Sequence, residues 1–270
     1  MANPPPRKCI FCGGVGNRSG EHLVANWVRH VIPRTTDYHE HRSIRLASNM
    51  SPTDLVKETV KFKQGNLGNQ TYSRVCKRCN SGWMKRIQDD VIPTLTPLIK
   101  GEWHDMNVID ANRIALWTAV TATVIAMSQD TCGVTTQDRQ YFFKNQGVPP
   151  KWTVWIGRIS GVPEISYCNR VLAVRSQFQS PQIQTEPNTL VTTIEIGQVL
   201  LHCVSAPYED LLPNPFSYGW NMGLLPIHPW GGDILPWQAL PILSYFSREH
   251  RNVRDFLYAA MVLGHDISVL

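Results

Sequence analysis

Apolar residues recur at helical spacing near the start of the chain and alternate with polar ones further along it. The sequence LVANWVRHVI predicts a helix over residues 21–32, which Pro33 ends. Residues 34–54 are polar and without a period, so they predict irregular structure. Alternation predicts a strand over residues 56–63, and a second short strand follows over residues 71–75. The segment between these strands, QGNLGNQ, is typical of a turn, so we expect the two strands to pair.

A helix over residues 80–91 follows, and Pro93 is expected to end it. Residues 92–106 contain two prolines and one glycine and predict a connection. The elements predicted after it are helices over Asn112–Ser128, Thr135 or Thr136 to Phe143 and Arg251–Leu263, and strands over Trp152–Ser160, Ile165–Arg175, Leu190–Ile196 and Val199–Ser205. The stretch Ile114–Met127 is apolar but too short and too rich in threonine to span a bilayer, which predicts a buried helix.

Charge divides the chain at the same connection. Residues 1–100 hold 16 Lys and Arg against 7 Asp and Glu, whereas residues 101–270 hold 10 against 14. We therefore predict an α+β protein with two domains, residues 1–100 and residues 101–270. The basic part suits a polyanionic partner such as nucleic acid, although a solvated basic face has the same composition.

Four of the seven cysteines form two Cys-x-x-Cys pairs, Cys9 with Cys12 and Cys76 with Cys79. A turn brings the sulfur atoms of such a pair onto one ion, and two pairs complete a closed tetrahedral zinc site. A closed site has a structural role, so this zinc would join the start of the chain to the helix near Cys79. The odd cysteine count and the lack of an apolar leader predict a reducing cytoplasm and no membrane partner.

Three polar residues near the cysteines have the chemistry that phosphodiester hydrolysis needs. His22 suits a general base, and Glu21 and Asn80 offer hard oxygen ligands for Mg²⁺ or Mn²⁺. Glu-His by itself is more typical of a structural or surface pair. Asn80 by itself is more typical of an N-cap for the helix that follows Cys79, and only its combination with the cysteines and Glu-His favours a metal ligand.

The motifs CIFCGG, GEH and VCKRCNSGWM together resemble the His-Me finger, or HNH, endonucleases, most closely their zinc-stapled endonuclease VII-like branch and bacterial and phage HNH-like proteins. The resemblance covers about residues 7–100. It implies a treble-clef ββα-metal domain, with Cys9, Cys12, Cys76 and Cys79 on zinc. It further implies Glu21 and Asn80 on one catalytic Mg²⁺ or Mn²⁺, and His22 as the general base. The rest of the chain would be a C-terminal α+β accessory domain.

The sequence departs from this family pattern in three ways. Asn80 stands where the family name has its last histidine, as in the resolvase branch, and Glu21 replaces the commoner aspartate. Fifty-three residues separate His22 from Cys76, which predicts an insertion over about residues 33–55. The asparagine that orients the base in the family has two counterparts here, Asn69 first and Asn66 second.

Basic residues flank the second cysteine pair and are predicted to contact phosphates: Lys77, Arg78, Lys85 and Arg86. The resemblance favours DNA as the substrate, and cutting two strands with one metal per site favours a homodimer. Two other functions fit the same residues. One is a zinc-dependent nucleic-acid-binding module without catalysis, and the other is a protein-interaction adaptor that uses the C-terminal region.

Overall fold

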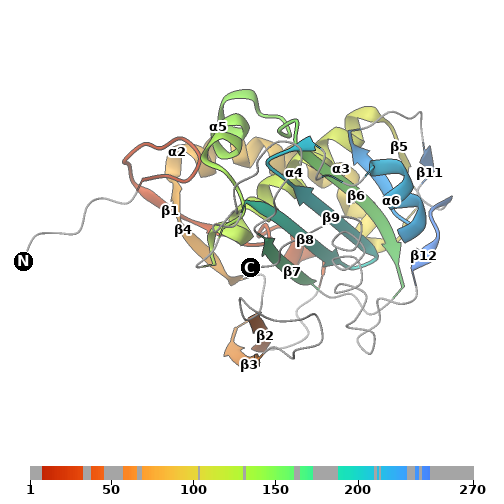
Figure 1. Cartoon of the computed structure of the whole chain (residues 1–270), viewed down its shortest axis with the longest axis horizontal. Coiled ribbons are helices and arrows are strands. Elements are labelled where there is room, and N and C mark those ends of the chain that lie inside the picture. Colours follow the sequence, from red (N-terminus) through yellow and green to blue (C-terminus); the bar gives the residue numbers. More distant parts are fainter. Residues whose placement is uncertain are drawn as a thin grey trace, which may run out of the picture.

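The computed structural model describes most of the chain up to residue 243. The described residues are 8–32, 38–45, 57–65, 69–102, 104–129, 132–160, 165–172, 188–209, 212, 214–229, 235–236 and 239–243. The helix predicted over Arg251–Leu263 lies outside this part of the chain. Helices and strands are mixed along the sequence, in agreement with the predicted α+β class (Figure 1).

The N-terminal region is built on an antiparallel pair formed by strands β1 (Arg18–His22) and β4 (Thr71–Cys76). Their register runs from Arg18 opposite Cys76 to His22 opposite Thr71, with an irregularity between Ser19 and Glu21. The chain then enters helix α2 (Lys77–Cys79) directly. Two strands and a helix thus form one unit, although 48 residues separate the strands. The predicted helix over residues 21–32 is reduced to α1 (Val28–Val31), because Glu21 and His22 belong to β1.

Strand β3 (Lys57–Gln64) does not pair with β4 as predicted. Its partner is β2 (Tyr38–Arg45), and the two form a separate two-stranded sheet. The prediction of irregular structure over residues 34–54 is therefore wrong in part. β2 has the sequence YHEHRSIR, which has no apolar alternation to reveal a strand.

The helix after the second cysteine pair is longer than predicted at both ends. It begins at Lys77, continues through a π-helical turn, η2 (Asn80–Met84), and runs on as α3 (Lys85–Lys100). Pro93 and Pro97 lie inside α3 and do not end it. The buried apolar face of α3 outweighs the local cost of the prolines, with Ile87, Val91, Leu95, Leu98 and Ile99 all packed in the core.

Gly101 provides the actual helix stop. Its φ of 75° is left-handed, its N–H donates to Leu98 O, and the N–H of Glu102 donates to Pro97 O. This pair of bonds is a Schellman motif, which satisfies the last carbonyls of the helix. The predicted connection over residues 92–106 is consequently helical through Lys100.

Helix α4 (Val108–Met127) is the central helix of the fold. It starts four residues earlier than predicted, because Asn107 and Asp110 form a capping box. Its length and composition would allow it to cross a membrane, but 72% of its most apolar segment is buried inside the protein. Helix α5 (Thr136–Asn145) follows, and the side chain of Thr135 caps it as predicted. α4 is thus the core helix that its apolar sequence predicts.

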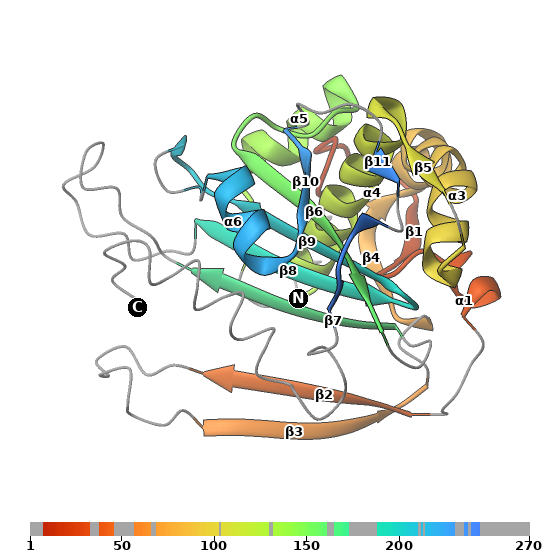
Figure 2. The same cartoon turned by 90° about the vertical axis from the view of Figure 1, so that its right-hand side faces the viewer.

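A six-stranded sheet is formed by most of the later strands, and α4 packs between it and α3 (Figure 2). The strand order is β10-β6-β9-β8-β7, with β12 beside β6, and every pair is antiparallel except β6 with β12. The four long strands confirm the prediction and are β6 (Trp152–Ile159), β7 (Ile165–Leu172), β8 (Thr189–Ile196) and β9 (Val199–Ser205). The smaller elements are β5 (Asp105–Met106), α6 (Pro215–Met222), β10 (Leu225–His228), β11 (Leu235–Pro236) and β12 (Ile242–Leu243).

The main hydrophobic core is continuous across the boundary predicted near residue 100. It contains Phe11 and Trp83 from the cysteine region, Trp117 from α4, and Val154 and Leu201 from the sheet. A smaller core on the other face of the sheet includes Trp155 and lies under α6. Residues before and after position 100 therefore pack on each other. The division of the chain into two domains stays a prediction.

Candidate functional site

The four paired cysteines converge on one point. Their sulfur atoms all lie within 4.8 Å of one another, and the sulfurs of Cys12 and Cys76 are 3.7 Å apart. A tetrahedral zinc ion with zinc–sulfur bonds of about 2.3 Å separates its sulfur ligands by roughly 3.8 Å. A disulfide needs about 2.05 Å, and all four cysteines are free. The donor set and its dimensions fit a structural zinc ion, as the sequence predicts.

Backbone geometry explains how the first pair reaches the second. The N–H of Gly13 donates to Cys9 O, the N–H of Cys9 donates to Gly14 O, and Gly13 has a φ of 71°. These bonds make the tight turn that brings Cys9 and Cys12 together. The N–H of Ile10 donates to Arg74 O, which fixes this turn to β4 just before the second pair.

The local environment shifts the pKa values of the cluster thiols in opposite directions. Burial alone raises the pKa of Cys9, but backbone N–H groups, first that of Cys76, outweigh it and lower the pKa to about 7. The N–H of Cys76 lies 3.5 Å from the Cys9 sulfur. Burial raises the pKa of Cys79 and Cys12. A bound zinc ion would reverse that effect, since zinc binds the thiolate form.

Glu21 is the second-last residue of β1, and it is buried, with 5% of its surface exposed. The Gln88 side chain on α3 donates to Glu21 Oε1 at 3.1 Å. Burial raises the pKa of Glu21 to about 7, and this hydrogen bond opposes the shift. Such a carboxyl is about half protonated at neutral pH, and a nearby cation would favour its ionised form.

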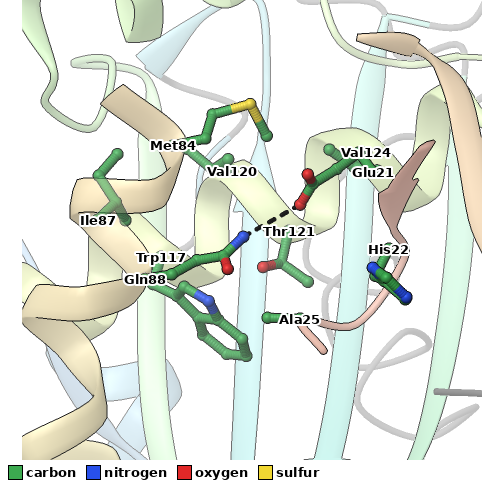
Figure 3. A pocket seen from close by; sticks show the side chains of 10 residues that line it. All are labelled: Glu21, His22, Ala25, Met84, Ile87, Gln88, Trp117, Val120, Thr121 and Val124. Carbon is green, nitrogen blue, oxygen red and sulfur yellow. Dashed lines mark hydrogen bonds between the residues drawn. The ribbon is translucent and has the colours of Figure 1, made fainter. Parts of the chain in front are cut away.

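A small pocket surrounds the Glu21 carboxyl, and Figure 3 shows this carboxyl directed toward Gln88. Most of the lining is apolar and comes from two helices: Met84 and Ile87 beside Gln88, and Trp117, Val120, Thr121 and Val124 from α4. The space open to the centre of a water molecule is about 10 Å³. This is room for about one water molecule or ion.

His22 lies next to Glu21 but is half-buried, and its ring points away from Gln88 (Figure 3). This divergence follows from the alternation of side chains along a strand. Burial, and then the charge of Arg29, lower the pKa of His22 below its ordinary value. The imidazole is therefore largely neutral at neutral pH, which is the form that accepts a proton.

Arg29 also links His22 to the predicted orienting residue. Its Nη1 lies 3.5 Å from Oδ1 of Asn69, two residues before the strand position opposite His22. Asn69 thus lies at the His22 end of the strand pair, and its role in orienting the base stays a prediction. Asn66, the second choice, lies outside the described residues.

Asn80 is inside a helix and does not cap it. The helix begins at Lys77 with Cys76 as its N-cap, and Asn80 has helical angles of −61° and −54°. Its Nδ2 donates to Ser19 Oγ on β1 at 2.5 Å. That bond uses the amide nitrogen, whereas a metal would use the amide oxygen.

The helix after the second cysteine pair therefore touches β1 at two points, through Asn80 on Ser19 and through Gln88 on Glu21. Sequence reasoning missed both Ser19 and Gln88. A signal for Gln88 was present, because Asn80, Met84 and Gln88 are four residues apart and so lie on one helix face.

The four predicted phosphate contacts are all exposed. Two of them have partners: Lys85 forms a 2.7 Å ion pair with Asp89, and Arg86 Nη2 donates to Gln146 Oε1 at 3.3 Å. Lys77 and Arg78 occupy the first turn of the helix, beside the cysteine cluster.

A second polar group lies in the smaller core. His202 is fully buried, with Nδ1 2.9 Å from Thr193 Oγ1 and Nε2 3.2 Å from the Tyr218 hydroxyl. Burial lowers the pKa of His202 to about 3, so it is neutral. Both ring nitrogens are satisfied, which identifies His202 as a structural core residue.

Comparison of the chain with protein-family models, curated proteins and solved structures gives no match, so the chemistry of this site rests on its own residues.

Proposed function

We propose that this protein is a metal-dependent endonuclease of the His-Me finger type, which hydrolyses phosphodiester bonds in DNA. One observation carries the proposal. A strand–strand–helix unit, joined by a four-cysteine cluster, has Glu21 and His22 at the end of its first strand and Asn80 in the first turns of its helix. This order and placement agree with a ββα-metal domain on a treble-clef zinc scaffold.

The proposal gives each of these residues a role. His22, neutral because its pKa is lowered, accepts a proton from the attacking water. Arg29 and Asn69 lie at the same end of the strand pair and position that base. The Glu21 carboxylate and the Asn80 amide oxygen would hold Mg²⁺ or Mn²⁺, whose charge would stabilise the phosphate and the leaving oxygen.

The test is cleavage of supercoiled plasmid by the zinc-loaded protein with Mg²⁺, with Mn²⁺, or with neither. We expect nicking or linearisation only with added metal. His22→Ala should reduce the rate by about 10²-fold or more, because general base catalysis contributes 10² to 10⁴. His30→Ala, an exposed histidine on α1, is the matched control and should cut as the wild type does. Equal rates for wild type and His22→Ala, at equal zinc content, would contradict the role of His22.

A zinc-dependent nucleic-acid-binding module without catalysis is the second candidate. The observation that favours it is the burial of Glu21, whose carboxyl already accepts a hydrogen bond from Gln88. Such a module would shift the mobility of DNA without added metal and would leave the plasmid intact with every metal tested. The same plasmid experiment therefore separates the two functions.

A further inference from the structure

The β2–β3 ribbon is a two-stranded sheet of its own, inserted between the two strands of the proposed nuclease unit. Its register is regular over eight pairs, from Tyr38 opposite Gln64 to Arg45 opposite Lys57. In both views it lies apart from the six-stranded sheet, on the side of β7 (Figures 1 and 2). Because residues alternate between faces along a strand and opposite residues share a face, the register sorts the ribbon into two faces.

The two faces differ in charge. One face carries Arg45, Lys57, Lys61 and Lys63, together with two histidines, a serine and a threonine, and it has no acidic position. Both glutamates of the ribbon, at positions 40 and 58, belong to the other face, beside the single cation at position 42. Lys61 and Lys63 are exposed. One face of the ribbon is thus entirely neutral or cationic.

The register also sets which positions of the basic face are opposite one another. Arg45 is directly opposite Lys57, and histidines are opposite Lys61 and Lys63. These positions are basic or neutral and none is acidic. A surface of this composition suits an anionic partner, so the register and the sequence favour a bound polyanion.

The ribbon is connected to the end of the strand pair that holds His22. The chain leaves β1 after His22 and returns at Thr71, which is opposite His22. Six residues lie between Gln64, at the near end of the ribbon, and Thr71, so the chain takes seven steps from one to the other. An extended chain spans at most about 3.5 Å per residue, which places this end of the ribbon within about 25 Å of the His22 end.

We propose that this basic face, the ribbon face of Arg45, Lys57, Lys61 and Lys63, binds the phosphates of a B-form DNA duplex with the ribbon in the major groove. That groove is about 12 Å wide and admits a two-stranded ribbon. The major groove of duplex RNA is deep and narrow, so the ribbon would not enter it. The inference deepens the proposed nuclease by naming the element that holds its substrate, and its test does not depend on cleavage.

The experiment measures binding of the full-length, zinc-loaded protein to a fluorescent 30-base-pair DNA by anisotropy, without Mg²⁺ or Mn²⁺, at several salt concentrations. The variant replaces Lys57, Lys61 and Lys63 with Gln. The matched control makes the same change at three exposed lysines elsewhere, Lys100, Lys144 and Lys151. We expect the ribbon variant to bind at least tenfold more weakly, and its slope of log K against log salt to fall by about 2 to 3. The control should change by less than twofold.

A second pair of variants keeps the test decisive if the triple variant misfolds. Arg45→Gln alters the basic face and Arg42→Gln the opposite face of the same strand, and only the first should weaken binding. Equal losses in both variants of either pair would overturn the proposal. So would equal affinity for duplex RNA, or ribbon-dependent binding to phosphatidylserine vesicles in place of DNA.

The outcome is separable from that of the nuclease proposal. Ribbon-dependent binding of DNA without cleavage under any metal would support the ribbon and contradict the nuclease. Cleavage with an unchanged KM in the ribbon variant would support the nuclease and contradict the ribbon.

Discussion

The side-chain amide of Gln88 on α3 donates a 3.1 Å hydrogen bond to the carboxyl of Glu21 at the end of β1. The two residues are 67 positions apart in the sequence, and both line a pocket that residues of α4 also line. A carboxyl with 5% exposure and one amide donor is poorly solvated, which explains its raised pKa. The ionised form of Glu21 therefore lowers the stability of the folded protein.

Replacing Glu21 with Gln should stabilise the protein at alkaline pH. The pKa of Glu21 is about 7 in the folded state and about 4.5 when unfolded, so folding takes up a proton between these values. The stability that protonation provides is complete below pH 4.5 and is lost as the pH rises to 7. Glu21→Gln mimics the protonated acid and should gain about 3 kcal/mol at pH 8 in urea unfolding without added Mg²⁺.

The control for Glu21→Gln is Glu102→Gln, at an exposed carboxyl whose ion pair with Lys100 is 3.8 Å long. It should change the free energy of unfolding by less than about 0.5 kcal/mol. If the difference between wild type and Glu21→Gln does not grow from pH 5 to pH 8, Glu21 does not titrate as the structure indicates.

Removing one cysteine of the cluster should release the metal. Cys12 is half-buried and lies 3.7 Å from Cys76, so Cys12→Ser leaves three sulfur ligands with little change in packing. We expect zinc content to fall from about one ion per chain to well below that, and the melting temperature to drop sharply. Structural zinc contributes on the order of 10 kcal/mol in small zinc peptides.

Cys168→Ser is the matched control, since Cys168 is also half-buried but lies on β7, away from the cluster. It should retain the zinc, measured by metal analysis of the purified protein. A Cys12→Ser protein that keeps a full equivalent of zinc would rule out the four-sulfur site.

A methyl group at Gly197 should break the contact between the sheet and the end of α3. Gly197, with a φ of 57°, forms the turn between β8 and β9, and a Cβ there would lie 2.4 Å from the carbonyl oxygen of Ile99. The new Cβ and this carbonyl oxygen are both held by the backbone, so neither can move aside unless the backbone shifts. Gly197→Ala should lower the free energy of unfolding by about 3 kcal/mol or more in chemical denaturation.

Gly65→Ala is the control that separates the cost of a left-handed backbone from the cost of a steric clash. Gly65 also has a positive φ, 95°, but nothing lies within 4 Å of the position its Cβ would take. Its substitution should cost only about 1 kcal/mol, from the left-handed backbone. Equal losses at both glycines would mean that the sheet and α3 do not approach as closely as the structure has them.

The elements with local signals in the sequence were predicted correctly. Apolar runs bounded by turn glycines predicted β6, β8 and β9 nearly to the residue, and Thr135 marked the start of α5. The two Cys-x-x-Cys pairs predicted a shared metal site, and the four sulfur atoms do converge. Local patterns were enough to predict these features, because turns, helix caps and short strands depend on residues that are close together in the sequence.

The other features depend on contacts between residues that are far apart in the sequence. α3 passes through Pro93 because its apolar face is buried on α4, a gain that local propensity does not contain. β4 pairs with β1 and not with β3, because a long insertion folds on itself as the β2–β3 ribbon. The pocket of Glu21 is closed by Trp117 and Val120, almost a hundred residues away in sequence. Burial sets the pKa of that carboxyl, and burial depends on which distant side chains pack there, a property that no local pattern in the sequence encodes.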